Sequence, residues 1–359
     1  MPNAIARETQ RLSDVFVAAG AVPLTADILL RAETLLDLYG EDIRGRAYVT
    51  ADPLRGEMML RPDFTVPVVQ MHMKTQVDPA RYTYAGPVFR RQENDDSRAI
   101  EFTQVGFEVF DGANTAASDA DVFVAISHAL DGLPARASVG DLGLLLAAVS
   151  GLQTTDVRKA ALLRHIWRPH KFLALLKRFG GGTPVSEKRK RLLSAKEPLL
   201  TASGDMGLRS QQEIEKRIAA LKKDAQTPPI STKEVGQIEE LLAIGGPLIE
   251  ATDELVSLAT TMPAIAKAVD QLKARNQALS ARGVDIESLY FEASYGRTTM
   301  EYYDGFVFGF YATGTNGLPP LATGGRYDAL TAQLGQGREQ PAVGAVIRPD
   351  LVCQLREEQ

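Results

Sequence analysis

The sequence predicts a mixed α/β fold of the α+β kind, in which an antiparallel sheet flanked by helices is interrupted by an all-helical insertion. Short apolar runs separated by turn residues fill residues 48–108 and return after residue 284, which is typical of antiparallel strands. Between them the apolar spacing is almost entirely helical and is punctuated by prolines. We therefore expect a core in two parts around an insertion: residues 1–150, then the helical insertion 151–285, then residues 286–359.

The composition agrees with a soluble globular protein. Of the 359 residues, 45% are hydrophobic and 24% are charged, which excludes disordered, collagen-like and membrane-spanning classes. The net charge of −5 does not suggest a general polyanion binder. The single cysteine, Cys353, cannot form an intramolecular disulfide, and the four histidines show no metal-site spacing. Because the first residues lack the apolar region of a secretion signal, we expect a reducing, cytoplasmic location.

Two helices of the first part have recognisable ends. Asn3 is placed to cap a first helix that ends at Gly20. Ser118 and Asp121 have the spacing of a capping box that opens a second helix, which stops at Gly132. Both helices carry apolar residues along one side, so we expect them to pack on the sheet.

The strands and the insertion follow from similar signals. Turn residues at Gly56–Glu57 and at Ala85–Pro87 separate the first strands. Two further capping boxes open helices of the insertion: Ser210 with Glu213, and Ser231 with Glu234. The later core segments are a strand at Leu289–Ala293, a strand at Tyr302–Thr313, a turn at Asn316–Gly317, a strand at Leu321–Gly325 and a helix near Asp328.

Polar residues gather in four of the strand-like segments: Arg61–Thr65, Phe89–Gln92, Glu101–Glu108 and Glu301–Gly305. Because alternate side chains of a strand share a face, Asp63 and Thr65 should point together, as should Gln104 and Glu108. Carboxylates, an amide and a hydroxyl suit a small cationic ligand that donates hydrogen bonds, such as an amino acid. The same alternation also describes an ordinary polar sheet face with solvated charges, and the pattern alone leaves both interpretations open.

The order of these segments resembles one family. The chain is similar over nearly its whole length to class II aminoacyl-tRNA synthetases of the histidyl type. It resembles most closely the synthetase-like regulatory subunits of short-form ATP phosphoribosyltransferase. The segments that carry the resemblance are Gly20–Pro23, Leu60–Pro67, Tyr84–Gln92, Glu101–Glu108, Tyr302–Tyr303 and Thr323–Asp328. The resemblance implies a class II synthetase-like core that dimerises through the region of the first of these segments.

The resemblance also implies a histidine-binding pocket. The matching positions of this chain are Asp63, Thr65, Arg90, Gln104, Glu108, Tyr302 and Tyr303. In the family, Asp63 and Thr65 would lie near the ligand's amino group, and the two tyrosines would lie against it. Arg90 matches an arginine that meets the ligand carboxylate or a phosphate. No metal and no cofactor is implied.

Departures from the synthetase pattern indicate a protein that does not activate an amino acid. Gln92 stands where a glutamate is expected, and Thr298 and Leu351 stand where the family has arginines. Arg348 replaces a glycine of the last motif. Arg297 is adjacent to Thr298, but in an extended segment it would face the other way unless a bulge intervenes. Fixed cations supply much of phosphoryl-transfer catalysis, so their loss argues against ATP activation.

We therefore expect a non-catalytic regulatory subunit that acts in histidine biosynthesis and confers feedback regulation by histidine. Its expected partner is a short catalytic ATP phosphoribosyltransferase subunit, with this chain as a dimer in a hetero-octamer of four and four. We expect no membrane contact. Neither tRNA nor an anticodon-reading domain is expected, because Asn94–Asp96 would repel a polyanion and only eight residues follow Leu351.

Two rival functions stay open at this point. One is a histidine–tRNA ligase-like enzyme that retains histidine and ATP binding. The other is a nucleic-acid-binding module that uses the helical insertion, whose most basic run is Lys188–Arg191. Four charges alone give weak affinity for nucleic acid, so a solvated helix face is the simpler interpretation of that run.

Overall fold

The computed structural model describes residues 2–39, 43–75, 77–92, 98–196, 210–297, 301–314 and 317–357. The chain forms two compact units, one of Met1–Ala147 with Leu241–Gln359 and the other of Ala148–Glu240. Within the described ranges, no helix is both long enough and apolar enough to cross a membrane.

The first unit is built on a sheet that has nine strands among the described residues, and most neighbouring strands in it run antiparallel. The exceptions are the parallel pairs of the first strand with the fifth and of the seventh with the ninth. In order across the sheet, the strands are β1 (Val22–Pro23), β5 (Ala80–Phe89), β6 (Glu101–Phe110), β12 (Ala342–Ile347), β11 (Ala322–Arg326), β10 (Phe306–Ala312), β7 (Ala135–Asp141), β9 (Tyr290–Glu292) and β8 (Gly245–Pro247).

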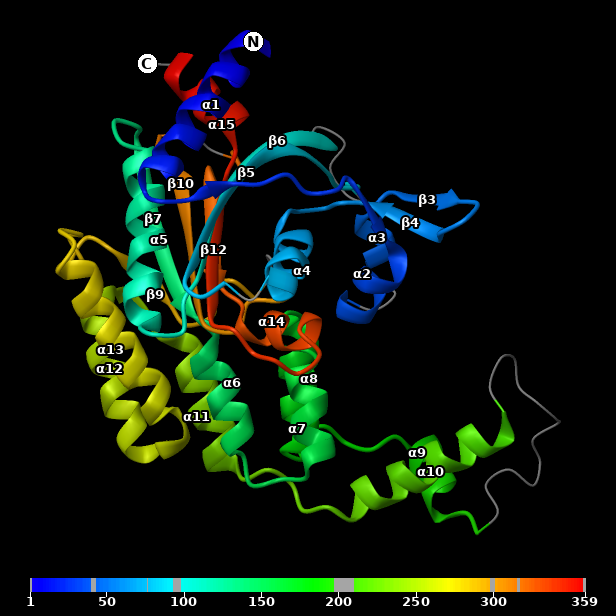
Figure 1. Ribbon diagram of the computed structural model, residues 1–359. Coiled ribbons are helices and arrows are strands. Elements are labelled where there is room, and N and C mark those ends of the chain that lie inside the picture. The colour runs from blue at the N-terminus through cyan, green and yellow to red at the C-terminus, as the bar shows by residue number, and fades with distance from the viewer. Residues whose placement is uncertain are drawn as a thin grey trace. The chain divides into compact units, whose positions relative to one another are not determined.

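Helices cover this sheet through aromatic contacts. The rings of Phe16, on α1 (Pro2–Ala18), and Phe107, on β6, stack with centroids 5.3 Å apart. On α5 (Thr115–Ala129), Phe123 packs its ring against Phe308 and Phe310 of β10. Figure 1 shows α1 beside α15 (Pro349–Glu357), so the first and last described helices meet. Burial of these large rings supplies much of the hydrophobic stabilisation of the core.

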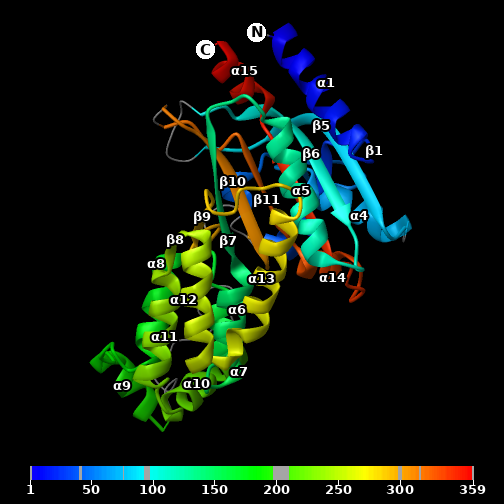
Figure 2. The ribbon, with the colours of Figure 1, turned by 90° about the vertical axis from the view of Figure 1, so that its left-hand side faces the viewer.

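A buried ion cluster joins a later helix to α5. Arg275, on α13 (Ala266–Ser280), donates to Asp119 of α5 and to Asp141 at the end of β7, and all three side chains are almost fully buried. Figure 2 shows α13 next to α5. Such a cluster is stable only with every charge paired, because an unpaired buried charge is costly.

The remaining elements of the first unit include a small sheet with the strand order β2 (Leu29–Arg31), β4 (Gly56–Leu60) and β3 (Val49–Asp52). Its core joins Leu30 and Met59 to Leu35 and Val66 from neighbouring helices. The other helices of this unit are α2 (Ala32–Tyr39), α3 (Ile43–Arg46), α4 (Thr65–Thr75), α12 (Leu248–Thr261), the short η2 (Pro263–Ile265) and α14 (Asp328–Leu334).

The second unit is helical wherever it has regular structure in the described ranges. Its helices are α7 (Asp156–Leu163), α8 (Pro169–Phe179), α9 (Glu187–Ser194) and α10 (Gln211–Gln226), and α6 (Leu142–Gly151) and α11 (Thr232–Ala243) run across its boundaries. The buried Arg158 of α7 donates to Asp224 of α10 and to the carbonyl of Pro228, just after that helix. The basic run on α9 buries none of its side chains.

The division at Glu240 differs from the insertion expected over 151–285. Helices α12 and α13 belong to the first unit. Helical periodicity shows that a segment is a helix but not what it packs against. Here the ion cluster of Arg275 ties α13 to the core.

Several local expectations hold and others need correction. Both predicted capping boxes of the insertion are present, at Ser210 and at Ser231. Helix α5 is capped by Asn114, so Ser118 lies inside it. Asn3 likewise lies inside α1 rather than before it. Asn316 lies outside the described residues, so the predicted turn there is not described.

One predicted turn is instead part of a strand. Ala85–Pro87 continues β5 without a break, paired with β6 throughout. Gly86, at a φ of +159°, leaves room for the side chains of Arg61 and Phe64, which a Cβ would crowd. The Gly–Pro pair thus marks a close approach of two segments, not a change of direction.

Candidate functional site

A cavity of about 360 Å³ in the first unit gathers the predicted site residues. All seven line it: Asp63, Thr65, Arg90, Gln104, Glu108, Tyr302 and Tyr303. Its volume is typical of a pocket for a small organic molecule. The polar clusters of the sequence therefore contribute side chains to one shared cavity.

Strand β6 supplies the floor of the cavity. Gln104 and Glu108 lie on the same face of the strand, as their alternation predicts, and both are buried. Gly106 lies between them and opposite Tyr84 of β5. A Cβ on Gly106 would overlap the ring of Tyr84, so glycine lets that ring lie flat across the sheet.

Glu108 is held by three hydroxyl groups. Tyr84 donates to its Oε1 at 2.7 Å and Thr65 at 3.3 Å, while Tyr327 donates to Oε2 at 2.6 Å. Burial raises the pKa of Glu108 to about 7, although the hydrogen bonds from the hydroxyls oppose that shift. The carboxyl group is therefore poised between its neutral and charged forms near neutral pH.

The segment that carries Asp63 is anchored by its neighbours. Arg61 donates to the carbonyls of Pro87 at 2.9 Å and of Ala26 at 2.5 Å. Its guanidinium lies 3.7 Å from the ring centroid of Phe64, and that ring stacks on Tyr84 at 4.2 Å. This column of planar groups fixes the backbone on both sides of Asp63.

The expectation that Asp63 and Thr65 share a strand face is wrong. Asp63 lies in a short connection, and Thr65 is the first residue of α4. Both residues still line the cavity, and Oδ1 of Asp63 accepts a hydrogen bond from the backbone amide of Thr65 at 3.1 Å, as in a helix cap. The start of a helix, and not a strand, therefore places both residues at the cavity.

Two buried acceptor atoms in the cavity have no partner among the described residues. They are Oδ2 of Asp63 and Oε1 of Gln104, on side chains that are 3% and 2% exposed. Burial raises the pKa of Asp63, and the positive charge of Arg90 partly offsets this. Buried polar atoms are seldom left without a hydrogen bond. A ligand with at least two N–H or O–H donors would satisfy both.

Arg90 and the tyrosine pair complete the walls. Arg90 follows β5 directly, and its Nε donates to the carbonyl of Pro62 at 2.8 Å. Tyr302 and Tyr303 pack edge to face at 4.9 Å, and the Tyr302 hydroxyl donates to Thr65 at 3.3 Å. These tyrosines precede β10 in an irregular segment, so their expected strand position is also wrong.

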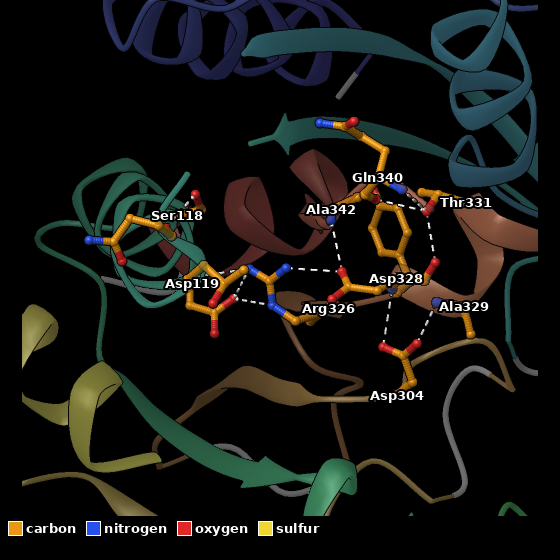
Figure 3. A network of polar contacts seen from close by, with 12 residues as sticks. Ser118, Asp119, Asp304, Arg326, Asp328, Ala329, Thr331, Gln340 and Ala342 are labelled. Atoms are coloured by element: carbon orange, nitrogen blue, oxygen red, sulfur yellow. Dashed lines mark hydrogen bonds and ion pairs between the residues drawn. The ribbon is translucent and has the colours of Figure 1, made fainter. Parts of the chain in front are cut away.

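A polar network supports the tyrosine segment from behind. Asp304 accepts hydrogen bonds from the amides of Asp328 and Ala329 at the start of α14. Burial raises the pKa of Asp304 to about 7. The guanidinium of Arg326 lies between Asp119 and Asp328 and donates to both, as Figure 3 shows.

The network also orients the tyrosine between Arg326 and Asp328. Because its two neighbours are fixed by ion pairing, Tyr327 directs its hydroxyl to Glu108. A second tyrosine therefore holds the acidic group from the side opposite Tyr84. The segments Tyr84–Gln92 and Thr323–Asp328 each contain one of these tyrosines, but nothing in the local pattern of either segment connects its tyrosine with Glu108.

Sequence reasoning missed other residues that line the cavity, among them Arg46, Phe102 and Pro320. Arg348 also lines it, whereas Leu351 is buried in α15. The departures at Thr298 and at Asn94–Asp96 lie outside the described residues. Among those described, no group of three or more histidine, cysteine or acidic side chains is arranged to hold a metal ion.

Comparisons with known proteins identify the family of the chain. A family model described as histidyl-tRNA synthetase matches residues 3–207 and 211–352. The ATP phosphoribosyltransferase regulatory subunit of Mesorhizobium japonicum is 30% identical, with 96% of each chain covered. The one from Allorhizobium ampelinum is 31% identical, with 93% of each chain covered.

Solved structures share the fold. A protein from Bacillus halodurans, described as an ATP phosphoribosyltransferase regulatory subunit/histidyl-tRNA synthetase, superposes with a TM-score of 0.68 at 20% identity, over 98% of this chain and 79% of that chain. The histidyl-tRNA synthetase of Nostoc sp. PCC 7120 gives a TM-score of 0.64 at 17% identity, over 99% of this chain and 72% of that chain. The predicted fold class, a class II synthetase-like sheet flanked by helices, is confirmed.

Proposed function

This chain belongs to the histidyl-tRNA synthetase family and, within it, to the ATP phosphoribosyltransferase regulatory subunits, and on that premise we propose that it binds free histidine and transmits that binding to a catalytic partner. It is the regulatory subunit of that transferase in histidine biosynthesis. The binding of histidine, and its transmission to the catalytic partner, are the parts that we propose.

The observation that carries the histidine proposal is the pair of unpartnered acceptors, Oδ2 of Asp63 and Oε1 of Gln104. Free histidine brings an ammonium group and an imidazole N–H, and therefore enough donors for both atoms. A carboxylate binds an ammonium group through charge-assisted hydrogen bonds, which are about twice as strong as neutral ones. A larger apolar ligand would leave both oxygens unsatisfied.

Each residue then has a role. Asp63 and Thr65 accept hydrogen bonds from the ligand's amino group. Gln104 and Glu108 accept hydrogen bonds from other N–H groups of the ligand. Tyr302 and Tyr303 form its apolar wall, and Arg90 meets its carboxylate. A site made of buried polar groups rejects analogues that lack the matching donors, because those groups stay unpaired.

We further propose that the chain has no synthetase activity. Gln92, Thr298 and Leu351 stand where the family pattern has charged groups that act on ATP. Leu351 is 6% exposed and belongs to the hydrophobic core, so it has no cationic role. Removing one fixed charge from a transition state costs on the order of a hundredfold in rate or more.

The proposed assembly is a dimer of this chain within a hetero-octamer of four regulatory and four short catalytic subunits, located in the cytoplasm. Neither tRNA nor a membrane has a part in it. Histidine then inhibits if it binds more tightly to the less active state of the complex. A coupling of about 1–3 kcal/mol between the sites, or roughly 5–150-fold in affinity, is usual for such control.

The test combines this chain with a short-form catalytic subunit from an organism that carries one of the similar regulatory subunits. Transfer of the phosphoribosyl group to ATP is measured with and without histidine. We expect transfer to require this chain and to be inhibited by histidine. The Asp63→Asn variant should still activate the partner but lose the response to histidine. Transfer that is unaffected by this chain would overturn the proposal.

The same preparation tests the synthetase alternative. An active ligase would catalyse histidine-dependent exchange of pyrophosphate with ATP. We expect none above the background of a Glu108→Ala variant. Measurable exchange that disappears in that variant would instead favour a ligase.

A further inference from the structure

The cavity continues beyond the proposed histidine site along the same face of β6. Phe102 is two residues before Gln104, so it lies about 7 Å farther along the strand on that face. It is six positions before Glu108, which corresponds to about 20 Å of strand. An amino acid that contacts Gln104 and Glu108 therefore does not fill the region of the cavity around Phe102.

A side chain of the protein occupies that region. The guanidinium carbon of Arg348 lies 4.1 Å from the ring centroid of Phe102, within the range of a stacked cation–π contact. Arg90 also approaches this ring, at 5.5 Å. Phe102 is 8% exposed, and both it and Arg348 line the cavity.

Arg348 is held in this position from the start of α15. Its Nη2 donates to Oδ2 of Asp350 at 2.5 Å and its Nε to Oδ1 at 3.3 Å. This two-point contact fixes the plane of the guanidinium as well as its location. The backbone amide of Arg348 donates to the carbonyl of Leu321, which anchors the main chain at the same point.

The charge of Arg348 is already matched by Asp350. A guanidinium paired in this way attracts a phosphate less than a free one does. What remains is its flat surface, which covers the aromatic ring. A nucleobase would use the same ring, because bases stack on exposed aromatic faces whatever their sequence.

We propose that Arg348 is a specificity-determining residue that occupies the stacking position on Phe102 and so excludes planar nucleobases from this cavity. The proposal rests on the proposed function, which it deepens, because it explains how a synthetase-like cavity takes an amino acid without a nucleotide. Asp350 is the positioning residue that keeps the guanidinium in place.

The test uses adenosine, which has a base but no phosphate, so that stacking is separated from charge. Its binding to the full-length chain is measured by calorimetry for the parent and for Arg348→Ala. We expect the parent to show no adenosine binding at millimolar concentration, and Arg348→Ala to bind it at least tenfold more tightly than that limit. The double variant with Phe102→Leu should lose the gain.

Arg55→Ala is the matched control, because it also removes an arginine that is paired with a nearby aspartate, in this case Asp52, at an exposed position outside the cavity. It should bind no adenosine. Asp350→Asn is a second route, since it releases Arg348 without removing any atom that lines the cavity, and it should give a smaller gain. It also keeps the test valid if Arg348→Ala fails to fold.

Two results would overturn the proposal. One is adenosine binding in the parent as tight as in Arg348→Ala, and the other is a gain that survives the loss of the Phe102 ring. Neither readout uses histidine. A chain that fails to bind histidine therefore contradicts the proposed function and leaves the adenosine result intact.

Discussion

Gly344 lies directly opposite Glu108 where β12 pairs with β6, and a Cβ at Gly344 would overlap the carboxyl group of Glu108. The acidic group at the centre of the cavity therefore exists in this position only because its neighbour on the next strand has no side chain.

Gly344→Ala should lower the free energy of unfolding by about 2–3 kcal/mol and abolish histidine binding, because an overpacked site shifts side chains and backbone. Gly236→Ala is the control. Gly236 lies on α11 with open space around it, and alanine there should raise stability by about 0.5–1 kcal/mol. Urea denaturation and calorimetry measure both quantities. Equal stability for the two variants would contradict the overlap.

Histidine binding should depend on pH through Glu108. Its pKa of about 7 means that a proton occupies the carboxyl group below that pH and competes with the donor of the ligand. As the pH rises from 6 to 8, the charged fraction grows from about a tenth to about nine tenths, so affinity should rise about tenfold.

Free histidine loses its imidazole proton in part of this range, so the Glu108→Gln variant serves as the reference. It should bind more weakly and retain only the pH dependence of the ligand. Calorimetry at several pH values gives both profiles. If the two profiles run parallel, Glu108 does not titrate with binding.

Asp63→Asn should separate binding from stability. Hydrogen bonds to a charged group contribute about 1.5–3 kcal/mol, so histidine affinity should fall by roughly 10- to 150-fold. The free energy of unfolding should stay the same or rise, because burial disfavours the charged form of Asp63, as its raised pKa indicates. A variant with unchanged affinity would remove Asp63 from the site.

Arg326→Met should be among the most destabilising substitutions of the first unit. It leaves Asp119 and Asp328 without their shared partner, and breaking a buried ion pair costs about 3–5 kcal/mol. Arg55→Met, at an exposed pair, should change stability by less than about 1 kcal/mol. Thermal and urea denaturation distinguish these values. Histidine affinity should fall as well, because Tyr327 would no longer be held toward Glu108.

The sequence alone was enough to predict which residues make up the site. Strand alternation placed Gln104 and Glu108 on one face, and the ordered motifs selected the seven residues that line one cavity. The capping boxes at Ser210 and Ser231 could also be predicted from the sequence, because a capping box is formed by residues three apart in the chain. Signals of this kind are local, and local spacing determines which side chains share a face.

Only the tertiary structure decided how those residues meet. Asp63 and Thr65 come together at the start of a helix, and Glu108 is held by Tyr327, which lies 219 positions away in the chain. The stacking of Arg348 on Phe102 and the position of Gly344 opposite Glu108 depend in the same way on strands paired across the core. The physical reason is that periodicity specifies a face, whereas the partner of that face is selected by how the whole core packs.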